Sequence, residues 1–197
     1  GREVDGLISL ARWFAQSGGA DAGRMARHRA ELPAGLTGRS KPALSAAAIV
    51  PGAYARGSAY GVPFGRVNAR VLAEAARSAP AIRITPWRVF LLEEARFVPI
   101  EGLIDDPVDS LLRADACPGA PDCPQATVET RDLGRCLAPQ IAGQLHVSGC
   151  DKACACSRPA DVTVTGRGGL YDLAFNSIPA SAALSRAELL DQFERRP

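Results

Sequence analysis

All six cysteines of this chain of 197 residues fall within residues 117–156. Four of them form two close pairs, Cys117-x5-Cys123 and Cys150-x3-Cys154. The first pair lies in a segment rich in proline and glycine, and the second follows a short apolar segment that ends in glycine. Thiolates that converge from separate loops are typical of a bound metal or metal cluster. The cysteine spacing therefore predicts a fold that brings these two loops together around one metal site.

Disulfide bonds and structural zinc are the alternatives to an iron–sulfur cluster. A secreted, disulfide-stapled domain usually distributes its cysteines along the chain, whereas 116 residues precede the first cysteine here. Structural zinc usually takes pairs separated by about two to four residues, and the Cys117-x5-Cys123 pair is wider. The spacing favours a [4Fe–4S] cluster over both alternatives without excluding either.

The local sequence around each pair favours the thiolate form. Cys150 and Cys154 would lie on one face of a helical turn over 149–155, because they are four residues apart. Gly149 permits a positive φ and a close approach of backbone amides to a cluster. These features lower the cost of presenting anionic sulfur.

The first pair lies before a predicted helix over residues 123–138. Gly119 is the permissive position in the proline-rich loop, and Asp122 is a candidate N-cap. Cys123 would then lie at a helix N-terminus, where the helix dipole favours a thiolate.

The remaining cysteines and the histidines have less specific interpretations. Cys136 follows the helical spacing of Leu133 and is expected to be a buried apolar residue. Cys156 either replaces a member of the second pair or is an inert neighbour. His146 is expected to be a partly buried, hydrogen-bonded histidine, and His28, between two arginines, a solvated surface residue.

Composition bounds the class of protein. Hydrophobic residues make up 47% and charged residues 22%, which indicates a folded protein. The net charge of +2 does not favour nucleic acid or an anionic membrane as a partner. No apolar run is long enough to span a membrane, and no signal segment precedes the helical pattern that starts at Val4. We therefore expect a cytoplasmic, reducing location, and a chain cut from a longer polypeptide because it opens on Gly1.

We divide the chain into three parts: a helical lead-in and linker (1–40), a first domain (41–104) and a second domain (105–197). The lead-in has an amphipathic helix over residues 3–16 and a second, mostly exposed helix over residues 21–31, followed by a linker over residues 33–42.

The first domain reads β-β-α-β, with one helix on a small sheet, which is typical of a ferredoxin-like half-domain in the α+β class. The predicted strands are Leu44–Val50, Ser58–Val62, Ile82–Thr85 and Val89–Leu92, and the helix runs from an Asn68 cap to Ser78.

The second domain is predicted to hold the cysteine loops between short helices and strands. The helices span 106–113, 123–138 and 185–193, and the strands 145–147, 162–165 and 170–175. The last two strands form a hairpin around Arg167-Gly168-Gly169, and Ser185 with Glu188 completes a capping box on the closing helix.

The cysteine arrangement resembles that of the nitrite and sulfite reductase superfamily. In that superfamily four cysteines bind a [4Fe–4S] cluster, and the last of them also ligates sirohaem iron. The sequences VPFGR at 62–66 and RITPWR at 83–88 resemble segments of its ferredoxin-like half-domain. The resemblance covers roughly residues 44–175 and implies the α+β fold, with a reductase-type α/β cluster-binding domain after the ferredoxin-like half.

Within the superfamily, the loops are most similar to the precorrin-3B synthase branch. The sequence ACPGAPDC at 116–123 resembles its C-x-GAP-x-C, and LHVSGCDKACA at 145–155 resembles its LHVSGC-x-KGCA. One departure is visible, since Cys156 stands near a histidine of the branch pattern CAHP. The resemblance implies that Cys117, Cys123, Cys150 and Cys154 hold the cluster, with Cys154 as a possible axial ligand of sirohaem iron or a neighbour of another iron.

The resemblance also implies a reaction. Members of this branch are monooxygenases that convert precorrin-3A to precorrin-3B in aerobic cobalamin biosynthesis, with O2 and NADH. Precorrins carry several carboxylates, so Arg66, Arg83 and Arg88 are candidate substrate clamps. No catalytic residue is assigned.

Family members are built as two similar halves, and this chain resembles the second. The N-terminal half of the same polypeptide is expected to supply much of the tetrapyrrole pocket, so this chain alone should be inactive. The alternatives are a sirohaem sulfite or nitrite reductase and a non-catalytic iron–sulfur electron-transfer module.

Overall fold

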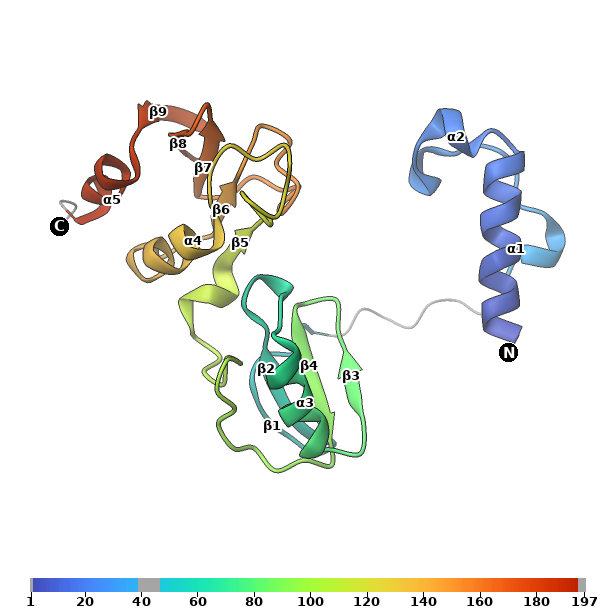
Figure 1. Cartoon of the computed structure of the whole chain (residues 1–197). Coiled ribbons are helices and arrows are strands. Elements are labelled where there is room, and N and C mark those ends of the chain that lie inside the picture. Colours follow the sequence, from blue (N-terminus) through green and yellow to red (C-terminus); the bar gives the residue numbers. More distant parts are fainter. Residues whose placement is uncertain (1, 39–46, 195–197) are drawn as a thin grey trace. The chain divides into compact units, whose positions relative to one another are not determined.

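The computed structural model describes residues 2–38 and 47–194. The chain divides into two compact units, Gly1–Ala47 and Ala48–Pro197, which are described separately (Figure 1). The predicted linker over residues 33–42 lies partly outside the described residues, as do the first three residues of the predicted strand Leu44–Val50.

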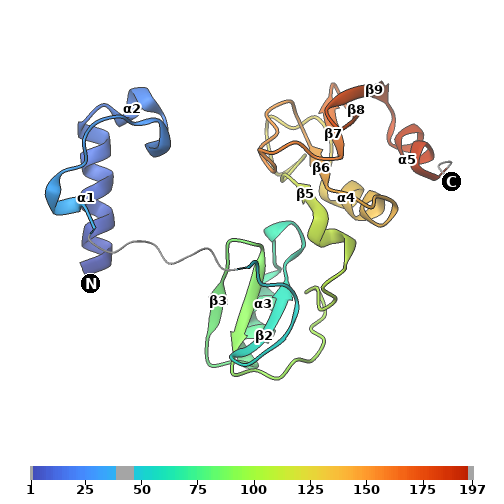
Figure 2. The ribbon, with the colours of Figure 1, turned by 180° about the vertical axis from the view of Figure 1, so that it is seen from behind.

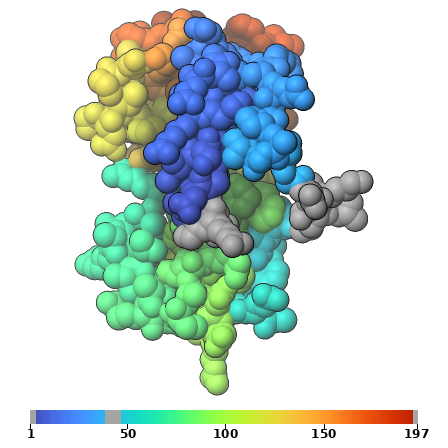
Figure 3. Space-filling view, turned by 90° about the vertical axis from the view of Figure 1, so that its right-hand side faces the viewer, coloured from blue at the N-terminus to red at the C-terminus, as the bar shows by residue number. Residues whose placement is uncertain are grey.

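The N-terminal unit is built on one long helix. Helix α1 (Arg2–Gln16) is followed by the single turn α2 (Gly19–Ala22) and by short 3-10 turns at Met25–Arg27 and Ala34–Leu36. The unit is blue in the space-filling view (Figure 3). The predicted helix over residues 3–16 is confirmed. The predicted helix over residues 21–31 is wrong, because Gly23 adopts a φ of 68° and ends α2 after one turn.

His28 is not a solvated surface residue. Its ring centroid lies 5.1 Å from that of Trp13 and 5.2 Å from that of Phe14. Its Nε2 is 2.7 Å from the Ser17 hydroxyl. The half-buried imidazole therefore packs on α1, and the surface expectation failed because aromatic contacts from twelve or more residues away are not visible in the local sequence.

The first sheet of the second unit is antiparallel and has the strand order β1-β2-β4-β3. Its strands are β1 (Gly52–Tyr54), β2 (Gly57–Gly61), β3 (Ile82–Ile84) and β4 (Val89–Glu93). Helix α3 (Ala69–Arg77) covers one face, and the two opposite views agree on this (Figures 1 and 2). The Asn68 side chain caps α3, as predicted, by accepting a hydrogen bond from the Arg70 amide at 2.9 Å.

Buried side chains hold α3 and the segment after β4 against the first sheet. Tyr60 and Leu92 are fully buried on the sheet beneath Ala75 of α3. The Tyr60 hydroxyl donates to the Val98 carbonyl at 2.7 Å, so the segment after β4 is tied down across the sheet. The predicted first strand is misplaced: residues 47–50 contain no strand, and the chain enters the sheet only after Pro51.

The second sheet is mixed and has the order β5-β6-β7-β8-β9. Its strands are β5 (Ala114–Ala116), β6 (Leu145–Ser148), β7 (Val162–Arg167), β8 (Leu170–Phe175) and β9 (Ile178–Leu184). Strands β5, β6 and β7 are parallel, whereas β7, β8 and β9 pair antiparallel. Gly168 and Gly169 both have positive φ in the predicted hairpin turn between β7 and β8.

One face of this sheet carries the core. Val147, Val164 and Leu173 lie side by side on adjacent strands and are almost fully buried. Helices α4 (Arg131–Leu137) and α5 (Arg186–Glu194) cover them with leucine and phenylalanine side chains. The opposite face carries polar residues, because side chains alternate along each strand.

The helical predictions in this region were only partly right. The 106–113 segment forms a 3-10 turn at Ser110–Arg113, and the helix predicted over 123–138 begins only at Arg131. The capping box is confirmed, since the Ser185 amide donates to the Glu188 carboxylate at 2.8 Å and the Glu188 amide donates to the Ser185 hydroxyl at 3.3 Å.

Candidate functional site

Two cysteines lie at the carboxyl ends of adjacent parallel strands. Cys117 directly follows β5, and Cys150 follows β6 by two residues. The register of β5 and β6 pairs Ala116 with Val147, so the loops that leave both strands start side by side. The carboxyl edge of parallel strands is where α/β sheets usually place ligands.

Every polar group of Cys117 has a partner. Its amide donates to the Val147 carbonyl at 3.3 Å, and its carbonyl accepts from the fully buried Thr130 hydroxyl at 2.6 Å. Its Sγ accepts a hydrogen bond from the Gly149 amide at 3.2 Å. Hydrogen bonds on its amide, carbonyl and sulfur therefore hold this cysteine in one position at the end of β5.

Position 149 requires glycine because there is no room for a side chain, and not because its backbone is left-handed. Its φ is not in the positive region, contrary to the sequence-based expectation. A Cβ at this position would lie 2.5 Å from the Ala126 Cβ and 3.3 Å from the Gly119 Cα. Its amide lies 3.2 Å from the Cys117 sulfur, and the predicted approach to a cluster stays a prediction.

The surroundings of Cys123 differ from the prediction. Its amide donates to the Gly119 carbonyl at 2.8 Å in a turn, and it is not at a helix N-terminus because α4 begins at Arg131. Asp122 caps no helix there, and its carboxylate instead lies 3.2 Å from Arg66 and 3.8 Å from Arg131. The Asp122 carboxylate is therefore paired with two guanidinium groups and does not cap a helix.

The Cys150–Cys154 segment forms turns and not the predicted helical turn. Ala153 has a φ of 50°, which interrupts helical geometry just before the exposed Cys154. Across residues 2–38 and 47–194, no three His, Cys, Asp or Glu side chains are arranged to hold a single metal ion. All six cysteines are free thiols, so none is committed to a disulfide.

A small cavity joins the two cysteine loops. It has a volume of about 210 Å³, and its lining includes Cys117, Cys154, Phe64, Arg88 and Arg131. Arg88 and Arg131 bring positive charge to this cavity, and the Asp115 carboxylate also lines it, 3.3 Å from Arg88. Two thiols beside guanidinium groups form a donor set that fits an anionic thiolate-ligated group.

Among the described residues, three of the seven non-glycine residues with positive φ lie at or next to this cavity. Phe64, Arg88 and Ala153 have φ values of 53°, 58° and 50°, which are unusual for residues other than glycine. The first two line the cavity, and the third precedes Cys154, which also lines it. Such conformations cost roughly 1–3 kcal/mol each and tend to cluster at functional sites.

The candidate substrate arginines have different surroundings. Arg88 lines the cavity, but its guanidinium donates to the Ala114 carbonyl at 2.8 Å and lies 3.3 Å from Asp115. Arg66 is exposed and bound to Asp122. Arg83 lies on β3 and is bound to Glu93 of the neighbouring strand. The structure therefore places Arg66 and Arg88 at cavities that Phe64 also lines, whereas Arg83 is paired within the first sheet, outside both cavities.

His146 lies on the polar face of the second sheet and is 3% exposed. Its Nε2 has no hydrogen-bond partner among the described residues, so the expected hydrogen bond at this atom is absent there. Burial lowers the pKa of His146, and the nearby Asp115 carboxylate partly opposes this effect. The imidazole is therefore held neutral.

Cys136 and Cys156 differ in burial. Cys136 is exposed on α4 and lies 3.7 Å from an Arg186 nitrogen, so the buried apolar interpretation is wrong. Cys156 is buried, and its thiol donates to the Arg158 carbonyl at 3.4 Å. The buried side of α4 is formed by Leu133, Gly134 and Leu137, and Cys136 lies at its edge, where the helical spacing alone does not determine burial.

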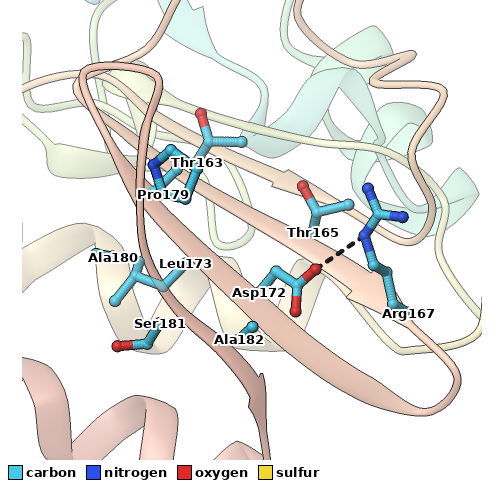
Figure 4. Close-up of a pocket in the computed structure, with 10 residues that line it drawn as sticks. Thr163, Thr165, Arg167, Asp172, Leu173, Pro179, Ala180, Ser181 and Ala182 are labelled. Atoms are coloured by element: carbon cyan, nitrogen blue, oxygen red, sulfur yellow. Dashed lines mark ion pairs between the residues drawn. The ribbon is translucent and has the colours of Figure 1, made fainter.

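A second cavity, of about 360 Å³, lies on the polar face of β7, β8 and β9 (Figure 4). Its two charged lining residues, Arg167 and Asp172, are paired with each other at 2.8 Å. Threonine, serine and alanine side chains form most of the remaining wall. With its charges neutralised and no thiol or imidazole in its lining, this cavity offers less chemistry than the cysteine cavity.

Comparisons with known proteins agree with the motifs. No protein-family model matches the chain. A precorrin-3B synthase of a Sinorhizobium species is 31% identical over 165 residues, which cover 71% of this chain and 36% of that protein. The NirA protein of Mycobacterium tuberculosis is similar in structure, with a TM-score of 0.51 and 19% identity over 79% of this chain and 39% of that one. The likeness to NirA confirms the α+β fold class.

The chain spans 36% of the length of the curated relative. No helix among the described residues is long and apolar enough to cross a membrane. Sequence motifs identified the cysteine loops, but they did not reveal the roles of Thr130 and Arg131. Both lie in a segment that reads as the middle of a longer helix, so no local signal marked them.

Proposed function

We propose that this chain, which is similar to a precorrin-3B synthase, carries the cluster-binding part of an oxidoreductase of the nitrite and sulfite reductase superfamily that converts precorrin-3A to precorrin-3B. The observation that carries the proposal is that Cys117 and Cys150 follow the carboxyl ends of two adjacent parallel strands. The proposed co-substrates are O2 and NADH, and the proposed location is the cytoplasm.

We propose that Cys117, Cys123, Cys150 and Cys154 hold a [4Fe–4S] cluster. When bound, such a cluster supplies single electrons to a neighbouring oxygen-activating centre. The Gly149 amide stabilises the anionic sulfur of Cys117, at the 3.2 Å seen between them. The ligand sulfurs of a cubane lie farther apart than those around a single ion, so a spread arrangement of thiols is compatible with this group.

The exposed Cys154 is the residue we propose as the link to a second iron, in sirohaem or another form. It lines the same cavity as Cys117 and projects from a turn that no helix restrains. Closure of this turn on Cys117 would complete the ligand set.

The substrate would be held by guanidinium groups, which bind carboxylates bidentately. Arg66 and Arg88 are the better placed of the three candidates, because both line cavities that share Phe64. Arg83 would first have to leave Glu93. We further propose that the remainder of a longer polypeptide completes the pocket and that this chain alone does not turn over substrate.

Iron and sulfide analysis after anaerobic reconstitution tests the ligand set. We expect about four irons per chain, with Cys150→Ser losing most of the iron. Cys136→Ser is the matched control and should retain it, because Cys136 lies on α4 beside Arg186. A wild-type chain without iron, or equal losses in both variants, would refute the cluster.

Turnover by the longer protein tests the reaction. Consumption of precorrin-3A should require O2. Reduction of sulfite or nitrite without precorrin turnover would identify a sirohaem reductase instead, and a loaded cluster with neither activity would identify an electron-transfer module.

A further inference from the structure

A third cavity adjoins the cysteine site and is dominated by arginines. It has a volume of about 470 Å³, and its lining includes Arg66, Arg131, Arg135, Asn68 and Phe64. Phe64 and Arg131 also line the cysteine cavity, so the two cavities are neighbours. Arg66 comes from the turn after β2, whereas the other two arginines come from successive turns of α4. We call this the arginine cavity.

The charges of the arginine cavity are only partly compensated. One carboxylate, Asp122, is shared by Arg66 at 3.2 Å and Arg131 at 3.8 Å. The Nε of Arg131 is buried without a hydrogen-bond acceptor among the described residues. Asp122 contacts these arginines from outside the lining, whereas Asp132 is the acidic residue in the lining, and it is exposed. The cavity therefore retains positive charge and an unused donor.

Arg135 is held over an aromatic ring. Its guanidinium carbon lies 5.4 Å from the centroid of the Phe64 ring, which in turn packs against Gly134 of α4. Within residues 2–38 and 47–194, Arg135 forms no ion pair. A guanidinium oriented by a ring face is free to use its outer N–H groups on a ligand.

We propose that the arginine cavity binds carboxylates of a tetrapyrrole, through Arg135, Arg131 and Arg66, and that Asp122 occupies Arg66 and Arg131 when no ligand is bound. The choice of a tetrapyrrole rests on the proposed function. Asp122 lies between Cys117 and Cys123, so its displacement by a ligand carboxylate would couple ligand binding to the first cysteine loop.

The size of the cavity sets which part of a ligand it takes. Small-molecule sites usually have volumes of about 300–1,000 Å³, so the arginine cavity suits the carboxylate-bearing edge of a tetrapyrrole rather than the whole macrocycle. A ligand bound by its edge would have the Phe64 ring beneath it and would extend toward the neighbouring cavity that Cys154 lines.

Titration of the whole chain with uroporphyrin, a tetrapyrrole with carboxylates on every pyrrole ring, tests the arginines. Binding is followed by the change in porphyrin absorbance. We expect Arg135→Gln to bind about tenfold more weakly, since charge-assisted hydrogen bonds are lost. Arg167→Gln is the matched control, because it removes the same charge from an arginine paired with Asp172 on β7 and β8.

Asp122→Asn tests whether Asp122 competes with the ligand for Arg66 and Arg131, and this variant should strengthen binding rather than weaken it. It removes the internal competitor, so uroporphyrin should bind several-fold more tightly, a gain that a misfolded variant would not produce. Asp172→Asn makes the same change of charge and should have little effect. Equal gains in both variants would show a general effect of net charge and overturn the proposal.

A porphyrin with cationic substituents serves as the second probe. Its binding should not weaken in Arg135→Gln, and a loss as large as that of uroporphyrin would overturn the proposal. Iron analysis of the same samples separates the two hypotheses. Uroporphyrin binding that depends on Arg135, in a chain without iron, would support the arginine cavity and refute the cluster. A loaded cluster, with uroporphyrin binding that does not depend on Arg135, would support the cluster and overturn the arginine cavity.

Discussion

Gly149 combines two requirements at one backbone position. Its amide reaches the Cys117 sulfur, and its missing side chain leaves room for Ala126 and Gly119 to approach. A side chain here would separate the two cysteine loops and turn the amide away from sulfur. The geometry of this single residue therefore links packing to the proposed ligand chemistry.

We predict that Gly149→Ala destabilises the fold by about 2 kcal/mol, because the new Cβ would lie 2.5 Å from the Ala126 Cβ. Chemical denaturation measures this change, and iron content after reconstitution should fall with it. The double variant Gly149→Ala with Ala126→Gly removes the clashing atom and should recover part of the stability. No recovery would show that the contact with Ala126 is not the cause.

His146 provides a prediction about pH. Burial holds its pKa in the folded chain below the ordinary value of 6.5, and Asp115 only partly opposes this. The unfolded chain therefore takes up a proton first as the pH falls, so this residue makes stability fall with pH from about 6.5 downward.

We expect His146→Gln to reduce the loss of unfolding free energy between about pH 7 and about pH 5, as measured by urea denaturation at each pH. The absolute stability of the variant is not the readout, since glutamine packs differently from imidazole. An unchanged pH dependence would contradict the neutral, buried state of His146.

Among the elements, those with local chemical signals were predictable from sequence. The Asn68 cap, the double-glycine hairpin and the Ser185 capping box each lie where expected, because a few neighbouring residues determine them. The order of the strands and the pairing of β5 with β6 are long-range, and no local pattern specifies them.

Strands β5 and β9, which were not predicted, have sequences with low strand propensity. Strand β5 is only three residues of ADA, and β9 is IPASAAL, rich in alanine and with a proline. Alanine and proline are depleted in strands, and proline is tolerated in β9 because this is an edge strand. The cysteine motifs located the site, but its arginine and threonine neighbours depend on the true start of α4 at Arg131.

Helix α5 offers a test of the capping box. Ser185→Ala removes the hydroxyl that the Glu188 amide binds, and should destabilise the unit by about 1 kcal/mol. The Ser185 hydroxyl and amide also donate to the Glu188 carboxylate and hold the pKa of Glu188 below its usual value, so that pKa should rise in the variant, as measured by NMR titration. A Glu188 pKa that stays low would show that another group sets it.

At the scale of the whole molecule, the two units should respond differently to iron. A ligand that binds only the folded state stabilises the unit that contains its site. We predict that reconstitution raises the melting temperature of the unit Ala48–Pro197 by about 5 °C or more, while amide exchange in α1 is unchanged. Stabilisation of α1 alone would contradict the site assignment.

The mixed pairing of the second sheet also bears on the order in which it forms. Strands β7, β8 and β9 follow one another through short turns, whereas β5 and β6 meet in parallel only after the segment that contains α4 has closed. Hairpins form within microseconds, and longer closures are entropically more costly. In pulse-labelled exchange, amides of β8 should become protected before those of β6. The cysteines of the two loops would thus stay apart until β5 and β6 pair. The chain would therefore bind iron only late in folding.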